Sequence, residues 1–109
     1  MYVYAIKSGV EKVEHVDLRL IMKDKLGKKT IFCNGELCSS VTVDKRYDLG
    51  GYIGGKDAEK MICNWVNNQI KELENLNFIV EIEYIRIFDK SGNCFDAFTN
   101  GWLDCPQLY

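Results

Sequence analysis

Strict alternation of apolar and polar side chains marks the segment Val16–Lys23. Its apolar residues occupy every second position, at Val16, Leu18, Leu20 and Met22, and the residues between them are mostly charged. A strand places successive side chains on opposite faces, so this pattern predicts a strand with one face on the core and the other mostly in water.

A second alternating segment, Phe78–Phe88, begins with apolar residues at Phe78, Val80 and Ile82 and places Tyr84 on the same face. The phase is lost near Ile85–Ile87, which indicates a β-bulge or a strand that is buried on both faces. A turn at residues 89–93 and a returning strand over Cys94–Thr99 are predicted to follow it.

The period changes to three and four residues between Ala58 and Leu76. The apolar positions form one stripe, made of Ala58, Met61, Ile62, Trp65, Val66, Ile70 and Leu73. This spacing predicts an amphipathic helix over about Asp57–Leu76, with the Asp57 carboxylate as its N-cap.

Shorter apolar runs predict three further strands, at Tyr2–Ile6, Lys29–Cys33 and Glu36–Val43. Asn34-Gly35 joins the last two and is a strong signal for a two-residue type I′ turn. The N-terminal half is therefore expected to be an antiparallel meander.

The predicted fold is a single α+β domain over residues 1–109, in the order β-β-β-β-α-β-β. One helix covers only one face of a mostly antiparallel sheet of five or six strands, so the other face is left for solvent or a partner.

Composition narrows the function classes. The 109 residues carry a formal charge of −2, which argues against a nucleic-acid partner. The charge is unevenly distributed, with a net of +2 over residues 1–60 and −4 over residues 61–109, an asymmetry that can steer a charged partner. No apolar run is long enough to span a membrane, and no signal peptide is recognised. Five cysteines in no disulfide-scaffold spacing then favour a cytoplasmic location with free thiols.

The segment Asp44–Gly55 breaks the strand pattern with four glycines and leads directly into the predicted helix. Its residues Gly50, Gly51, Tyr52, Ile53, Gly54 and Lys56, with Arg46, form a candidate ligand-contacting loop, because glycines and a helix N-terminus suit a phosphate. The segment matches neither the P-loop nor the dinucleotide motif. A plain connection between sheet and helix is the alternative interpretation.

Residues that carry catalytic or metal chemistry are few. Cys33 and Cys38 lack metal-site spacing, and the register of a two-residue turn places Cys33 opposite Glu36, so both are read as structural thiols without a metal or other cofactor. The sole histidine, His15, is expected on the solvent face, and Glu81 and Glu83 are expected to be surface carboxylates. The lysines around the turn after Asp24 are expected to form a solvated loop.

These observations favour a non-enzymatic binding protein, of the general kind of an inhibitor, an immunity protein or a phage-type counter-defence protein, that occludes a macromolecular partner. Tyr52, Ile53, Trp102 and Tyr109 are its candidate contacts, because aromatic residues dominate interfaces. Docking of the C-terminal tail on its own sheet and a homodimer contact are both open. The alternative function is binding of a nucleotide or phosphorylated metabolite by the Gly50–Lys56 loop, and enzymatic activity ranks last.

Overall fold

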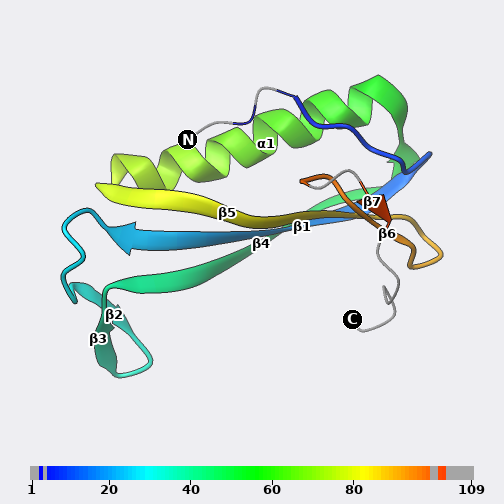
Figure 1. Ribbon diagram of the computed structural model, residues 1–109. Helices are drawn as coiled ribbons and strands as arrows, with labels where there is room; N and C mark the ends of the chain where they lie inside the picture. The colour runs from blue at the N-terminus through cyan, green and yellow to red at the C-terminus, as the bar shows by residue number, and fades with distance from the viewer. Residues whose placement is uncertain (1–2, 4, 99–100, 103–109) are drawn as a thin grey trace.

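Two long strands, β1 (Val13–Asp24) and β4 (Ser40–Ile53), pair along one side of the main sheet, with β4 at its edge. The computed structural model describes residues 3, 5–98 and 101–102, the last two through their backbone only. Its elements are β1 (Val13–Asp24), β2 (Ile31–Cys33), β3 (Glu36–Cys38), β4 (Ser40–Ile53), α1 (Gly55–Asn75), β5 (Phe78–Phe88), β6 (Cys94–Asp96) and β7 (Gly101–Trp102). The main sheet has the antiparallel order β4-β1-β5-β6-β7, and α1 packs across one face (Figure 1). The predicted α+β fold class is confirmed.

The core lies between the sheet and α1. The alternating residues of β1 are buried as predicted, with Val16 and Leu20 fully buried and Leu18 only 1% exposed. The helix supplies residues three and four apart, Ala58, Ile62, Val66 and Ile70, all fully buried. Removal of each such aliphatic side chain from water contributes about 1.5–3 kcal/mol, so this layer is the main source of stability.

The predicted irregularity in β5 is a β-bulge at Glu83. Arg19 of β1 pairs with Tyr84 but Leu20 pairs with Ile82, so Glu83 has no opposite residue. The extra residue restores Ile85 and Ile87 to the helix face, where both are buried. It also turns Tyr84 onto the open face, the face of the sheet that α1 does not cover, and the predicted side for Tyr84 is therefore wrong.

The predicted meander in the N-terminal half is also wrong. β1 pairs with both β4 and β5, and β2 and β3 form a separate two-stranded sheet within the connection from β1 to β4. The predicted strand Glu36–Val43 is interrupted at Ser39, where the chain passes from this hairpin into the main sheet. The turn prediction is confirmed, since Asn34 and Gly35 have φ values of 51° and 83° and Cys33 faces Glu36.

The glycine-rich segment Asp44–Gly55 does not break the strand pattern, because β4 continues to Ile53. Val13 pairs with Ile53 and His15 with Asp48, so residues 49–52 lie opposite Glu14 alone. This wide bulge needs a left-handed backbone, and Gly51, at φ +80°, supplies it. Gly51 therefore allows β4 to bulge and then to pair with β1 again at Ile53.

The helix begins at Gly55 and ends at Asn75, with Gly54 as N-cap, and Asp57 lies in the first turn without capping it. The predicted start at Asp57 is thus two residues late. The reason is close packing, because a Cβ on Gly54 would collide with the carbonyl oxygen of Glu11. A Ser or Asp cap has no space at this position.

The two ends of the chain differ from expectation as well. Val3, Ala5 and Ile6 form no strand, and the predicted strand Tyr2–Ile6 is wrong over these residues. Instead, the segment runs along α1, where the Val3 N–H donates to Asn67 Oδ1 at 2.8 Å and Asn67 Nδ2 donates to the Val3 carbonyl at 2.7 Å. The strand predicted over Cys94–Thr99 ends at Asp96.

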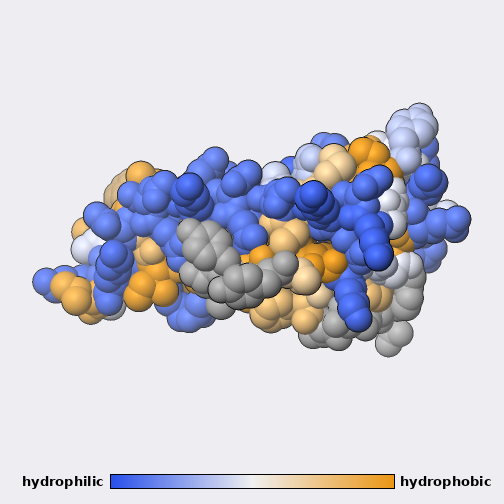
Figure 2. Space-filling view, turned by 90° about the horizontal axis from the view of Figure 1, so that it is seen from above, coloured by the Kyte–Doolittle hydropathy of each residue, from blue (hydrophilic) through white to orange (hydrophobic). Residues whose placement is uncertain are grey.

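The described residues include no helix that is long and apolar enough to cross a membrane. On the helix side of the molecule hydrophilic atoms predominate along the upper part of the view, and hydrophobic atoms reach the surface in the middle, at the upper right and at the left-hand end (Figure 2). In Figure 1 that end holds the start of β5 and the β2–β3 hairpin.

Candidate interaction surfaces

The predicted glycine-rich site lies at the bulge in β4 and is occupied by the chain's own side chains. The Lys90 stem packs over Gly51, and Lys90 Nζ lies 4.5 Å from the centroid of the Tyr52 ring. Lys12 Nζ donates to the Tyr52 carbonyl at 3.4 Å. A hollow of about 300 Å³ remains, but the two lysines that line it already contact Tyr52.

The helix N-terminus beside this bulge is also a poor phosphate site. Gly54 packs against the Glu11 carbonyl, whose partial negative charge opposes an anion, while Asp57 lies in the first turn of α1. Ile53 is half-buried and Lys56 is exposed. The geometry therefore gives no specific support to the Gly50–Lys56 loop as a phosphate-binding element.

The other predicted contacts do not lie together. Arg46 is in the middle of β4 on the open face, where it is ion-paired with Asp17. Trp102 is in β7, at the opposite edge of the five-stranded sheet. Tyr109 lies outside the described residues, as do residues 103–108, so the prediction of a docked tail can be followed only as far as the pairing of β7 with β6.

His15 is not the exposed residue that its position in the pattern predicts. It lies on the open face, but its ring stacks on Phe88 with 4.5 Å between centroids, and Nε2 is buried without a hydrogen-bond partner in the described structure. Burial, followed by the charge of Arg46, lowers the pKa of His15 below its usual value. The bulge at Glu83 explains the difference, because it places Phe88 on this face.

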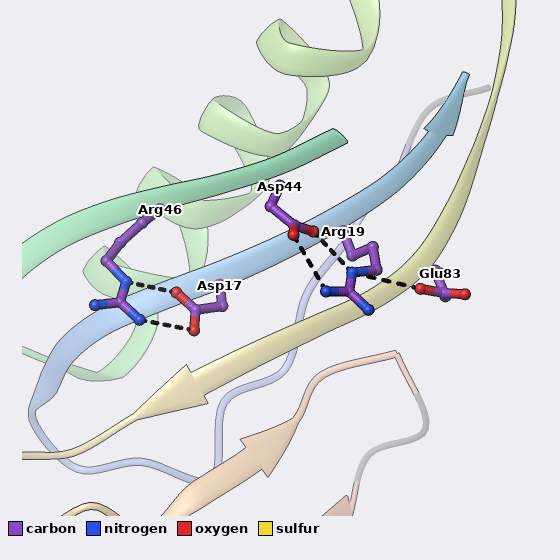
Figure 3. Close-up of polar contacts among 5 residues, drawn as sticks. All are labelled: Asp17, Arg19, Asp44, Arg46 and Glu83. Carbon is purple, nitrogen blue, oxygen red and sulfur yellow. Dashed lines mark hydrogen bonds and ion pairs between the residues drawn. The ribbon is translucent and has the colours of Figure 1, made fainter. Parts of the chain in front are cut away.

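Ion pairs cover the centre of the open face (Figure 3). The Arg46 guanidinium forms two hydrogen bonds with Asp17, at 2.7 and 3.0 Å, and Arg19 forms two with Asp44, at 2.7 and 3.1 Å. Arg19 Nε also lies 3.6 Å from Glu83 Oε2. Each of these two Arg side chains thus has an Asp partner, and a hollow of about 260 Å³, lined in part by Asp17, Asp44 and Arg46, remains between them.

The same pairing determines the electrostatics of this face. Hydrogen bonding from Arg19 lowers the pKa of Asp44, and hydrogen bonding to Asp17 raises the pKa of Arg46. Lys23 is likewise bound to Glu81 at 2.9 Å, so Glu81 is a surface carboxylate that is engaged in an ion pair. Each of these three basic groups has an acidic partner, which leaves little net charge to attract a partner of either sign.

Four of the five cysteines lie within the described residues. Cys33, Cys38 and Cys63 are half-buried free thiols, and Cys94 is fully buried. Cys63 donates to the Val3 carbonyl at 3.2 Å. Across the described residues, His, Cys, Asp and Glu side chains form no group of three that could hold a metal ion.

The β2–β3 hairpin carries two large exposed apolar side chains that face each other. Phe32 and Leu37 are directly opposite each other across the two strands and are 72% and 56% exposed. Leu26, in the loop that leads to the hairpin, is 77% exposed. Figure 1 shows the hairpin extending away from the main sheet, on the side opposite α1.

The base of this hairpin is firmly attached. Ile31, on the other side of β2 from Phe32, is buried. The Asp24 carboxylate accepts hydrogen bonds from the backbone of Leu26 and Lys28 and, at 2.7 Å, from the Thr30 hydroxyl. These bonds, the one from Thr30 above all, lower the pKa of Asp24. The apolar pair is therefore presented by an ordered support.

The loop that leads to the hairpin is basic. Residues 25–38 contain three lysines and one glutamate, a net of +2, whereas the chain as a whole has a formal charge of −2. All three lysines, at positions 25, 28 and 29, are exposed. The lysine cluster expected from the sequence thus precedes the hairpin in the chain, whereas the exposed Phe32–Leu37 pair was not predicted. The Asn34-Gly35 turn already places Phe32 opposite Leu37, but only the structure shows which hairpin face is left uncovered.

Comparison with known proteins yields no relative for this chain. No protein-family model, no curated protein and no solved structure matches it.

Proposed function

We propose that this chain is a non-enzymatic protein-binding module that contacts a protein partner through the β2–β3 hairpin. The proposal rests on the cross-strand pair Phe32–Leu37, two large apolar side chains that are more than half exposed on a projecting hairpin. Aromatic and aliphatic anchors of this kind enter pockets at the centre of protein interfaces.

The support beneath the pair favours binding. A two-stranded hairpin is only marginally stable in water by itself, and this one is ordered by buried Ile31 and by the hydrogen bonds of Asp24. A preordered hairpin loses less conformational entropy when it binds.

The positive charge near the Phe32–Leu37 pair in the chain favours an acidic partner. Exposed Lys25, Lys28 and Lys29 lie in the loop before the hairpin and give residues 25–38 a net charge of +2, which suits an apolar pocket with an acidic rim and would accelerate encounter with it. A single-stranded nucleic acid is the less favoured partner, because Phe32 is the one aromatic ring among the exposed apolar side chains Leu26, Phe32 and Leu37, and successive bases would need more than one ring to stack on.

The function is tested by capture of partners from the cells that make the protein. The variant Phe32→Ser/Leu37→Ser removes the apolar pair, and Leu76→Ser is the matched control, since Leu76 is 64% exposed at the end of α1. We expect a partner that wild type and the control retain, that the double variant loses, and that dissociates as salt is raised. Equal capture by all three forms, or recovery of nucleic acid alone, contradicts the proposal.

A further inference from the structure

The outer edge of β4 is the longest free strand edge in the described structure. Nine consecutive residues, Ser40–Asp48, pair one for one with β1, and β4 is the first strand in the sheet order. Its outer side has no strand partner among the described residues. Such an edge presents a row of backbone N–H and C=O groups that can pair with another strand.

Apolar side chains border this edge on the helix side. Val43 and Tyr47 are half-buried at the margin of the core, and the Tyr47 ring stacks on Trp65 with 5.2 Å between centroids. Trp65 is itself only half-buried. The edge therefore leaves a strip of apolar surface that a further strand would cover.

The charged side chains of the edge alternate in sign on the open face. Asp44 and Arg46 both project there, as their ion pairs with Arg19 and Asp17 show (Figure 3). Both remain about half exposed, at 60% and 52%. A strand of the same sequence that runs in the opposite direction would bring the complementary charge to each.

We propose that two copies of this chain pair antiparallel through their β4 edges, about a two-fold axis at Lys45. In this register Asp44 of each copy lies opposite Arg46 of the other, and Val43 lies opposite Tyr47. Opposite charges and apolar pairs that face each other directly are the favourable cross-strand combinations. Thr42–Asp48 all lie within the regular run of the strand.

Neighbouring registers form less favourable cross-strand pairs. A two-fold axis at Asp44 or Arg46 places that residue directly opposite the same residue of the second copy, so that like charges face each other. A centre at Val43 leaves Asp44 opposite Thr42, without an ion pair. A centre at Tyr47 is cut short by the bulge that begins at Leu49. At Lys45 itself two ammonium groups meet, but both side chains are exposed and their flexible stems can diverge.

The resulting dimer is a continuous antiparallel sheet with both helices on one face. It presents two copies of the β2–β3 hairpin, one at each end of the paired strands. The inference does not depend on the proposed function, because the Phe32–Leu37 pair lies outside the new contact.

Charge variants test the pairing by sedimentation. In Asp44→Arg and in Arg46→Asp alone, like charges face each other, so each variant is expected to be monomeric at concentrations where wild type is dimeric. A mixture of the two sets opposite charges together again and is expected to form a heterodimer. Mixing repairs neither in-chain ion pair, so recovery reports the contact between copies.

The matched control applies the same reversals on the exposed surface of α1, as Glu72→Arg and Lys71→Asp. Each of these is expected to remain dimeric. Monomeric wild type at its highest soluble concentration overturns the proposal, and so does a dimer that both β4 variants leave intact.

A cysteine at the axis tests the register. Opposed residues of an antiparallel ladder have Cα atoms about 4.5–5.5 Å apart, within the range of a disulfide. With oxidised glutathione as the electron acceptor, Lys45→Cys is expected to give a dimer linked at position 45, since two thiols lose two protons and two electrons as glutathione is reduced. Thr42→Cys, which faces Asp48 of the second copy, is the control. Equal linkage through both positions, or none through position 45, contradicts the register.

Discussion

The central sheet and the β2–β3 hairpin use similar apolar residues with opposite results. In β1, Leu18 lies beneath α1 and is 1% exposed, whereas Phe32 of β2 is 72% exposed. Both residues belong to antiparallel strands, and each lies directly opposite an aliphatic residue of a neighbouring strand. The difference is the covering layer: α1 lies over the first strand, and no described element covers the outer face of the hairpin.

This contrast separates stability from function. Burial in the β1–α1 layer stabilises the fold, while exposure of Phe32 and Leu37 contributes nothing to it and costs solubility. Large apolar groups that remain exposed on an ordered support are typical of interaction sites.

The largest expected effect is in the covered layer. Leu18→Ala should lower the free energy of unfolding by about 2–5 kcal/mol, because it removes buried methyl groups and leaves a cavity. Chemical denaturation monitored by circular dichroism measures this change. A loss below about 1 kcal/mol would mean that the layer does not carry the stability assigned to it.

The open face should respond to pH through His15. Its pKa is lowered in the folded state by burial and by Arg46, so below about pH 6.5 the unfolded chain binds more protons than the folded one. The free energy of unfolding should therefore fall as pH decreases from 7 to 5, by at most about 1.4 kcal/mol per pH unit for one proton.

The control is His15→Gln, because His15 is the only histidine and the lowered pKa values of Asp24 and Asp44 place their losses at more acidic pH. This variant should show a flatter profile between pH 7 and 5. A wild type whose stability rises as pH falls through this window would show that the imidazole is not held neutral.

A smaller effect is expected from the ion pairs that cover the open face. A double-mutant cycle with Asp17→Asn and Arg46→Met should give a coupling energy of about 0.2–1 kcal/mol, because the Arg46 side chain is 52% exposed and water screens the pair. Coupling should weaken in high salt. A value above about 2 kcal/mol would instead identify this pair as a main determinant of the fold.

The smallest effect on stability is expected in the hairpin. Phe32→Ser should change the free energy of unfolding by no more than about 0.5 kcal/mol, since the ring is mostly in water already. The same denaturation series as for Leu18→Ala measures it. A loss comparable to that of Leu18→Ala would show that the ring packs within the chain and is not free for a partner.

Local patterns were sufficient for much of the fold. The period of two in Val16–Lys23, the Asn34-Gly35 turn, the bounds of Phe78–Phe88 and most of the helix are confirmed, because each depends on side chains close together in the sequence. The extension of β4 past Gly50 and Gly51 was missed. Two glycines predict a loop, and only the pairing of Val13 with Ile53 makes them a bulge within a strand.

The candidate surfaces were harder to predict. Gly50–Lys56 attracted attention as a ligand loop, yet its glycines accommodate the bulge and the Glu11 carbonyl. Phe32 and Leu37 looked like ordinary strand residues, because both faces of the hairpin are partly apolar and Ile31 is the one that is covered. Which face is buried depends on tertiary packing, and local sequence does not encode it.

Site-specific photocrosslinking tests the central claim most directly. A photoreactive amino acid is placed in the hairpin at Leu37 or, as a control, at Leu76 on the end of α1, and the protein is irradiated in the cells that make it. The account predicts a discrete crosslink to an acidic protein from position 37 and none from position 76. The same crosslinks from both positions, or none from position 37 in folded protein, would contradict binding through the β2–β3 hairpin.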